Sequence, residues 1–286
     1  MQRFSSNGKA HDKAGWYVCH ETHLLINGAN KWGIIGTFGD WRTGNTHQWN
    51  SYSTFFRLSR EERSELVHRQ QVQAAQLRAQ RQAAADQAHR KAVKMWLSAQ
   101  PASTAHPYLM RKRVGAYNIR QVGNLLLIPL CDLDGTLHSV QTIVPNGTKH
   151  FLSGTPKRGM FHLIGDRLDH PQGVYLCEGY ATGASLYEAY RLPVLVGFDA
   201  GNLFPVVSAY RARFPHTPLT ICADNDRDPA SKGYMVGVKK AREVCAAFPG
   251  VGLIVPEFPA AAPLKLSDFN DLATLLGGSV HKEIIP

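Results

Sequence analysis

The pattern of apolar and polar residues is most regular in residues 173–286, where short apolar runs alternate with helical segments. The apolar runs lie at 174–177, 194–196, 219–223 and 251–255, and the helical segments lie at 181–190, 203–214 and 233–248. Short runs of β-branched and aromatic residues that alternate with helices are typical of a parallel sheet with right-handed crossovers. We therefore predict an α/β domain over residues 173–286, with the runs 174–177 and 219–223 side by side.

The first hundred residues show two other patterns. Residues 1–55 contain four of the five tryptophans and turn-favouring pairs such as Asn27-Gly28, which predicts a small aromatic-rich β module. No Gly or Pro occurs from Asn45 to Gln100, and Ser59-Arg-Glu-Glu62 is a pattern typical of a helix start. Residues 56–100 are therefore predicted to form one long basic helix that acts as a solvated spacer.

A third pattern precedes the α/β region. Two strand-like runs, 124–132 and 137–144, are joined by Asp134-Gly135, a pair that favours a hairpin turn. A third run begins at Lys149 after a further turn at Asn146-Gly147. We therefore predict a three-stranded antiparallel meander within a mixed α/β subdomain that covers residues 101–172.

Carboxylates follow two of the predicted strands. Glu178 comes directly after the run 174–177, and Asp224 and Asp226 come directly after the run 219–223. In an extended backbone Asp224 and Asp226 point to the same side, and the carboxyl ends of parallel strands meet at one edge of a sheet. Carboxylate oxygens suit Mg²⁺ or Mn²⁺. Glu178, Asp224 and Asp226 are therefore predicted to hold a divalent ion, with Asp228 and Asp268 as further ligands; the alternative is an ordinary doubly wound domain with acids in its loops.

These motifs carry a family resemblance. A Glu-Gly turn after one strand, an Asp-x-Asp after a later strand, and helices between them resemble the Toprim domain of bacterial-type primases, topoisomerases, some nucleases and recombination mediators. The piece Glu178-Gly-Tyr-Ala-Thr-Gly183 is similar to the Glu-Gly-Tyr-Ala-Thr-Ala motif of primases carried by conjugative plasmids and satellite phages, and departs from it only at Gly183. The resemblance implies a Toprim catalytic domain at 173–286, preceded by a primase-type subdomain at 101–172.

The activity that this resemblance implies is DNA primase activity, the synthesis of short RNA primers on single-stranded DNA. Its implied catalytic residues are Glu178, Asp224 and Asp226, with Glu178 as general base or as metal ligand. The implied cofactor is Mg²⁺ or Mn²⁺, and the implied substrates are a single-stranded DNA template and ribonucleoside triphosphates. The chain lacks the phosphate-binding loop Gly-x-x-x-x-Gly-Lys-[Ser/Thr] of a helicase, so a separate helicase or replication initiator is an expected partner.

Charge is distributed unevenly along the chain. Residues 1–172 contain 22 Lys and Arg against 11 Asp and Glu, whereas residues 173–286 contain 10 against 11. Because Lys and Arg neutralise phosphates, the front part is predicted to hold a polyanion, although a basic surface kept for solubility would show the same excess. The candidate nucleotide- or template-binding residues, for each of which a solvated surface role is the alternative, are Arg111, Lys112, Arg113, Lys149, Lys157, Arg158, Thr182, Trp41 and Arg42.

Two rival functions and several exclusions follow from the same residues. A Toprim nuclease would use the same ions to activate water, and a non-catalytic nucleic-acid-binding module would keep the fold alone. The five cysteines form no Cys-x-x-Cys pair, so neither a zinc ribbon nor a disulfide framework is indicated. The chain has no apolar run long enough for a membrane span, and a cytoplasmic location is expected.

Overall fold

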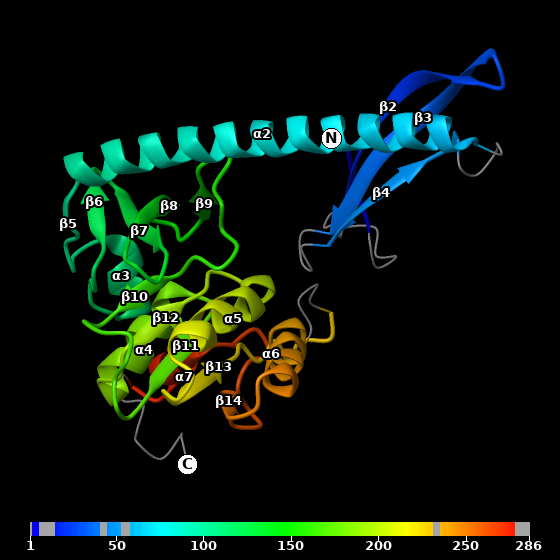
Figure 1. The fold of residues 1–286 in the computed structure, drawn as a ribbon. Helices are drawn as coiled ribbons and strands as arrows, with labels where there is room; N and C mark the ends of the chain where they lie inside the picture. Colours follow the sequence, from blue (N-terminus) through cyan, green and yellow to red (C-terminus); the bar gives the residue numbers. More distant parts are fainter. Residues whose placement is uncertain (1, 6–14, 41–44, 53–57, 231–234, 278–286) are drawn as a thin grey trace. The chain divides into compact units, whose positions relative to one another are not determined.

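The structure is a computed structural model that describes residues 2–5, 15–40, 45–52, 58–230 and 235–277. It contains two compact units, Met1–Ala83 and Ala84–Pro286. Helix α2 (Arg60–Ser98), labelled in Figure 1, contributes residues to both units. No helix in these described ranges is both long and apolar enough to cross a membrane.

The N-terminal unit contains the predicted β module as a four-stranded antiparallel sheet. Its strands, in the order in which they pair, are β1 (Gln2–Phe4), β2 (Gly15–Ile26), β3 (Ala29–Asp40) and β4 (Thr46–Asn50). Asn27 and Gly28 join β2 to β3 with φ angles of 52° and 74°, the left-handed conformation that tight hairpins require. Leu24, Ile26 and Ile35 pack with Leu66 of α2, so the helix covers one face of the sheet.

Helix α2 confirms the predicted long helix. The Ser59 hydroxyl accepts a hydrogen bond from the Glu62 backbone N–H (3.2 Å), and a Glu62 carboxylate oxygen accepts one from the Ser59 N–H (2.8 Å). This reciprocal pair is a capping box, which satisfies two donors at the helix start. The helix then continues for 39 residues, about 58 Å at the usual rise per residue, because no Gly or Pro interrupts it.

The C-terminal unit begins with an antiparallel sheet. Its strands, in order, are β5 (Gln100–Pro101), β6 (Arg120–Val122), β7 (Leu125–Cys131), β8 (Leu137–Ile143) and β9 (Lys149–Phe151), and α3 (Pro107–Lys112) lies between β5 and β6. The predicted meander corresponds to β7, β8 and β9. Gly135 and Gly147 stand in the turns at φ 78° and 93°, where other residues would be strained.

The second sheet of this unit has the strand order β10-β12-β11-β13-β14. Its strands are β10 (His162–Ile164), β11 (Val174–Cys177), β12 (Val194–Val196), β13 (Leu219–Cys222) and β14 (Val251–Ile254). The predicted parallel arrangement is confirmed for the last four strands. The sequence did not predict β10, which precedes residue 173 and adds to the edge of the sheet antiparallel to β12.

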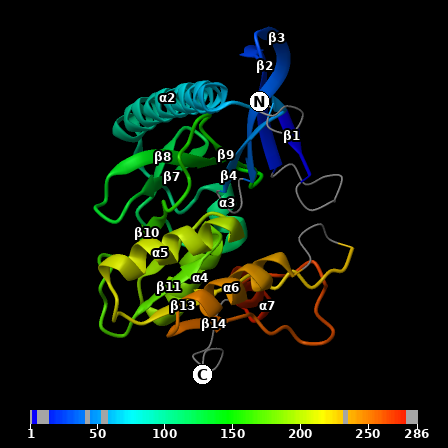
Figure 2. The same cartoon turned by 45° about the vertical axis from the view of Figure 1, so that its right-hand side comes forward.

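Helices cover both faces of the second sheet (Figure 2). The helices of this layer are α4 (Tyr180–Tyr190), α5 (Leu203–Arg213), α6 (Val236–Ala247) and α7 (Phe269–Leu275). Residues of α4 and α7 share one core with Tyr175 and with Leu126 and Ile128 of β7, while residues of α5 and α6 pack with Leu176 on the opposite face. The two sheets of the C-terminal unit therefore share a hydrophobic core, which holds β7–β9 beside the start of α4.

Candidate active site

Glu178 and Asp224 follow two strands that are direct neighbours. Strands β11 and β13 run parallel with Leu176 opposite Ile221, which confirms the predicted pairing. Glu178 comes one residue after β11 ends and Asp224 comes two residues after β13 ends. Because both strands leave the sheet at their carboxyl ends, the two side chains emerge at the same edge, where open α/β sheets bind ligands.

The carboxylates at this edge influence one another's ionisation. Burial raises the pKa of Asp224, and the neighbouring charges of Glu178, Asp268 and Asp226 raise it further. Burial also raises the pKa of Glu178, with Asp226 as the main charged contributor, while a hydrogen bond from the Ala200 backbone opposes the shift. Like charges in a low-dielectric site disfavour one another's ionised forms. The fold therefore gathers acids that destabilise each other when no cation is present.

Two oxygens of this group have no hydrogen-bond partner among the described residues. They are Glu178 Oε1 and Asp224 Oδ1, and both are buried. A buried carboxylate oxygen without a donor is costly, because it has lost water and gained nothing in exchange. A divalent cation would satisfy both oxygens, and their hard donor character fits Mg²⁺ or Mn²⁺.

The described residues contain no ready-made cluster of three or more His, Cys, Asp or Glu side chains at metal-binding geometry. In proteins Mg²⁺ is usually held by one or two carboxylates and keeps waters and substrate phosphates as its other ligands. The two partnerless oxygens of Glu178 and Asp224 thus fit a site that substrate completes.

Asp226 and Asp268 flank the pair on two connected loops. The Asn225 backbone N–H donates to the Ser267 carbonyl (2.7 Å), which ties the loop after β13 to the loop before α7. Burial raises the pKa of Asp226, and a hydrogen bond with Ser267 opposes that shift. Asp268 is the N-cap of α7, where its side chain accepts from the Asp271 N–H (2.7 Å). The tie between the loops thus places Asp268 beside the Asp224 loop.

Asp228 is placed differently from the other predicted ligands. One of its carboxylate oxygens accepts a hydrogen bond from the Ala230 N–H (2.9 Å), so the side chain closes its own turn. It is absent from the charges that act on the pKa of Glu178 or Asp224. The structure therefore groups Asp226 and Asp268, but not Asp228, with the central pair.

A cationic pocket of about 280 Å³ adjoins the acids. Four of the predicted binding residues line it: Arg111, Lys112, Lys149 and Thr182. Tyr108, Gly179 and Asp268 also contribute to its wall. Protein packed around the Lys149 ammonium lowers the pKa of this lysine, although part of its side chain remains exposed. The negative charges of Asp268 and Asp224 raise the same pKa. The pocket and the acid group therefore share one electrostatic environment.

The remaining predicted binding residues lie elsewhere. Arg113 ends α3 in a left-handed conformation, and Lys157 forms an ion pair with Asp199. Neither these two nor Arg158 lines the cationic pocket. Trp41 and Arg42 lie outside the described residues. The sequence alone therefore could not tell which of the candidate binding residues line the pocket.

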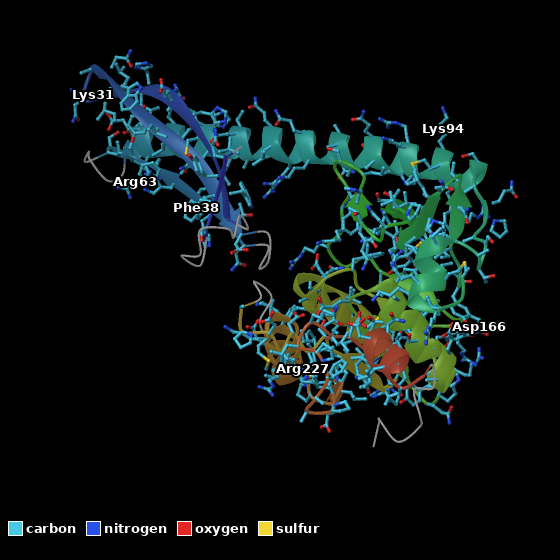
Figure 3. The ribbon with its side chains drawn as sticks, turned by 180° about the vertical axis from the view of Figure 1, so that it is seen from behind. Lys31, Phe38, Arg63, Lys94, Asp166 and Arg227 are labelled. Carbon is cyan, nitrogen blue, oxygen red and sulfur yellow. The ribbon has the colours of Figure 1, made fainter. Side chains whose placement is uncertain are left out.

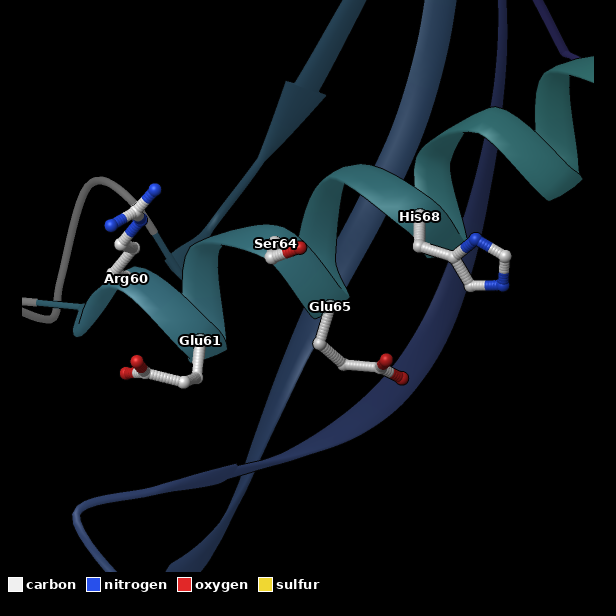
Figure 4. Close-up of a pocket in the computed structure, with 5 residues that line it drawn as sticks. All are labelled: Arg60, Glu61, Ser64, Glu65 and His68. Atoms are coloured by element: carbon white, nitrogen blue, oxygen red, sulfur yellow. The ribbon is translucent and has the colours of Figure 1, made fainter.

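A larger hollow of about 680 Å³ occurs in the N-terminal unit along the first turns of α2 (Figure 4). It is lined by Arg60, Glu61, Ser64, Glu65 and His68, all from one helix face. Glu65 pairs with Arg69 one turn further along (2.6 Å), as exposed helical ion pairs commonly do. The volume of a hollow therefore does not identify the active site, because the side chains that line this one come from a single face of one helix.

The comparisons with known proteins agree with this geometry. The Toprim domain family matches residues 173–278, which contain β11 to β14 and all the grouped acids. Residues 173–278 form a Toprim domain. The Toprim primase family implies the use of divalent metal ions in general, and the partnerless oxygens of Glu178 and Asp224 would suit such an ion.

Two curated Escherichia coli proteins named DNA primase TraC are similar to this chain. One is 30% identical over 279 residues, which is 94% of the chain, and the other is 35% identical over 169 residues, which is 57% of it. The chain spans only 18% and 16% of the length of these relatives. The similarity of the first relative extends through the N-terminal unit as well as the Toprim domain.

Two solved structures of the bacteriophage T7 primase show a weaker likeness. The primase fragment of the T7 primase-helicase protein has a TM-score of 0.42 and 17% identity, covering 63% of this chain and 72% of that chain. The second structure contains T7 primase domains bound to an RNA/DNA hybrid, together with the lagging-strand DNA polymerase. It has a TM-score of 0.41 and 18% identity, and the match covers 59% of this chain and 84% of that chain. The likeness at this level carries no functional argument.

Gly237 lies against the acid group of the Toprim domain, a proximity that the sequence did not reveal. It lies in the first turn of α6, where a Cβ atom would come within 2.8 Å of Glu178 Oε1 and 2.9 Å of the Asp224 carbonyl oxygen. Only a residue without a side chain lets the helix approach the two acids this closely. The available clue was a glycine between Val236 and Val238 in a predicted helix, where glycine ordinarily costs about 1 kcal/mol relative to alanine.

The raised pKa values predict how metal binding depends on pH. A carboxyl whose folded-state pKa lies above its unfolded value near 4 makes the folded state less stable as pH rises from that value towards the raised one. The metal-free Toprim domain should therefore lose stability between about pH 5 and pH 8, and a divalent ion should restore it most at the higher pH. With Mn²⁺ at roughly 100 times its Kd, we expect the melting temperature to rise by about 5 °C at pH 8 and by much less at pH 5. Equal shifts in melting scans at both pH values would contradict this account of the acids.

Proposed function

We propose that this chain contains the primer-synthesising part of a DNA primase of the plasmid or phage type. The observation that carries the proposal is the position of the partnerless oxygens of Glu178 and Asp224 beside the cationic pocket. Sequence similarity to DNA primase TraC, extending over 94% of the chain, supports the same reaction class. The substrates are then a single-stranded DNA template and ribonucleoside triphosphates.

The reaction joins the 3′-hydroxyl oxygen of the primer to the α-phosphorus of the incoming nucleotide, and pyrophosphate leaves. A divalent ion, Mg²⁺ or Mn²⁺, would neutralise the charge on the attacking and leaving oxygens. Glu178, Asp224 and Asp226 would hold that ion. The charge of Asp268, which acts on the pKa of Asp224, would adjust the electrostatics of the site. Alternatively, if Glu178 does not ligate the ion, its raised pKa brings it towards the working pH and suits it to accept the hydroxyl proton.

The pocket residues have a separate role in this proposal. Lys149 and Arg111 would bind the triphosphate oxygens, since their charges line one wall of the pocket, and Lys112 would do so from its ion pair with Asp271 (3.2 Å). Thr182 lies in the first turn of α4, where backbone N–H groups favour a phosphate. Arg111 is held in place by its hydrogen bond to the Pro145 carbonyl (2.8 Å), so its charge is presented by a fixed side chain.

Primer synthesis can be separated from the two rival functions in one assay. The chain is incubated with circular single-stranded DNA, four ribonucleotides, one of them labelled, and either Mg²⁺ or Mn²⁺. The proposal predicts short labelled oligomers that require both template and metal. Cut template without oligomers would instead identify a Toprim nuclease, and binding without any reaction would identify a non-catalytic module.

Removing the Lys149 charge tests the pocket itself. Lys149→Ala should raise the KM for ribonucleotides about tenfold, because it removes a charge-assisted contact worth on the order of 1.5 kcal/mol. The matched control is Lys94→Ala, which removes an exposed lysine of α2 labelled in Figure 3. Initial-rate kinetics at saturating template measure both variants. An unchanged KM for Lys149→Ala would remove this residue from the nucleotide site.

The proposal carries expectations about the cellular setting. We place the chain in the cytoplasm, in the replication of a plasmid or phage, where Mg²⁺ is the abundant divalent ion. A separate helicase or replication initiator would supply the unwound template. Adding a replicative helicase from the same replicon to the primer assay should increase synthesis on a partly duplex template.

A further inference from the structure

The sheet of the N-terminal unit has one face that α2 does not cover. Alternate residues of a strand point to opposite faces, so Trp16, Leu24 and Ile26 share the face that packs on α2. The Arg81 guanidinium lies 4.3 Å from the centre of the Trp16 ring, which closes that face further. Side chains of the other parity, such as Tyr17 and Phe38, point away from α2.

Aromatic side chains gather on this open face. Tyr17 of β2, Phe38 of β3 and His47 of β4 stand directly opposite one another in the strand register. The rings of Phe38 and His47 are stacked with centres 5.3 Å apart and planes 25° apart, and the Phe4 ring lies 6.1 Å from the Tyr17 ring. The row therefore forms a continuous aromatic strip across the four strands.

Two tryptophans extend the strip along the same face. Trp49 lies opposite Gly36, and Trp32 lies opposite His23 on the same parity as Phe38. Trp32 and Phe38 are six residues apart on β3, which is about 20 Å along an extended strand. The aromatic side chains remain 37–54% exposed, which is unusual for residues of this size: Phe4, Tyr17, Trp32, Phe38 and Trp49.

The character of this face matches unpaired nucleic-acid bases. Aromatic rings on an open sheet are platforms on which successive bases stack, and every base has a face that can take part. The polar side chains of Glu21 and His23 point to the same face as the rings, which distinguishes it from the continuous aliphatic surface of a protein core. Affinity at this face would come from the rings rather than from charge, because the described residues of β1–β4 on this face include Glu21 and Asp40 and no Lys or Arg. Figure 3 labels Phe38 towards one end of the sheet and Lys31 near the turn at the other end.

We propose that this aromatic face, formed by Phe4, Tyr17, Trp32, Phe38, His47 and Trp49, binds single-stranded DNA by base stacking. The site is separate from the Toprim residues, and it needs neither a divalent ion nor a nucleotide. It would hold several unpaired bases along the strip between Phe38 and Trp32. Duplex DNA does not fit, because its bases are already stacked and paired.

The test uses the full-length chain and a fluorescein-labelled oligothymidylate, with EDTA present and about 0.3 M salt to weaken phosphate contacts. Fluorescence anisotropy should show that Phe38→Ala and Tyr17→Ala each weaken binding about fivefold or more, the effect of losing one stacked base. Phe38→Trp should keep wild-type affinity, because it retains a ring. Leu25→Ala removes an exposed aliphatic side chain from the same face and should also leave affinity unchanged.

Three results would overturn the proposal. The first is wild-type affinity in the combined Tyr17→Ala and Phe38→Ala variant, with the folded state verified by circular dichroism. The second is equal competition by duplex DNA. The third is a concentration-dependent dimer that the combined variant abolishes, which would assign the face to a second copy of the chain. Because the assay contains no metal or ribonucleotide, it can succeed even if the primer assay fails, and the reverse also holds.

Discussion

Asp224→Asn is expected to abolish primer synthesis while making the metal-free chain more stable. The variant keeps the size of the side chain but removes the charge that would bind a divalent ion. Metal ions contribute several kcal/mol of transition-state stabilisation, and each 1.4 kcal/mol corresponds to a factor of ten. The rate of labelled ribonucleotide incorporation should therefore fall by about 10³-fold or more.

The stability gain has a separate physical cause. At pH 8 the folded chain must bury the Asp224 charge beside Glu178 and Asp268, and this crowding raises the pKa of Asp224. A neutral amide removes that repulsion. We expect the metal-free melting temperature to rise by about 2–8 °C, equivalent to roughly 1–2 kcal/mol.

Asp166→Asn is the matched control for this variant, because Asp166 is an exposed surface acid of the same unit, labelled in Figure 3. It should change neither activity nor melting temperature. A simultaneous loss of activity and of stability in Asp224→Asn would mean that Asp224 supports the fold rather than the reaction.

Gly237→Ala should lower primer synthesis by about 10–100-fold without unfolding the chain. Its added methyl group would lie within 2.8 Å of Glu178 Oε1 and 2.9 Å of the Asp224 carbonyl oxygen, so both groups must move. A displacement of about 1 Å in a catalytic group can cost a factor of 10². Alanine otherwise suits a helix better than glycine, which offsets part of the crowding in the free energy of unfolding.

Steady-state kinetics and melting scans measure the two effects of Gly237→Ala separately. Val236→Ala, in the same turn of α6 but 43% exposed, is the control and should retain normal activity. Normal kcat in Gly237→Ala would show that the approach of α6 does not position the two acids.

The sequence predicted the features that depend on local patterns. The strands that carry Glu178 and Asp224 were found because each is a short apolar run that ends on a carboxylate. The start of α2 was found because Ser59 and Glu62 have the spacing of a capping box. In each of these cases, residues that are neighbours in the chain determine the structure.

The features that it missed depend on contacts between distant residues. Strand β10 has only three residues, and its place beside β12 is set by a neighbour about thirty residues later. Lys157 forms an ion pair with Asp199, 42 residues away, and this partner could not be deduced from the sequence of a basic loop. Likewise, position 237 requires a glycine only because Glu178 and Asp224, from two other loops, lie against it.

Direct binding of Mn²⁺ to the purified chain is the measurement that tests the central claim most directly. Electron paramagnetic resonance reports free Mn²⁺, so a titration gives the number of bound ions without any assay of activity. We predict specific binding at pH 8 that Mg²⁺ displaces, that weakens as pH falls towards 5, and that Asp224→Asn removes. Unchanged binding in Asp224→Asn and in Glu178→Gln would contradict the assignment of these two acids as the metal site.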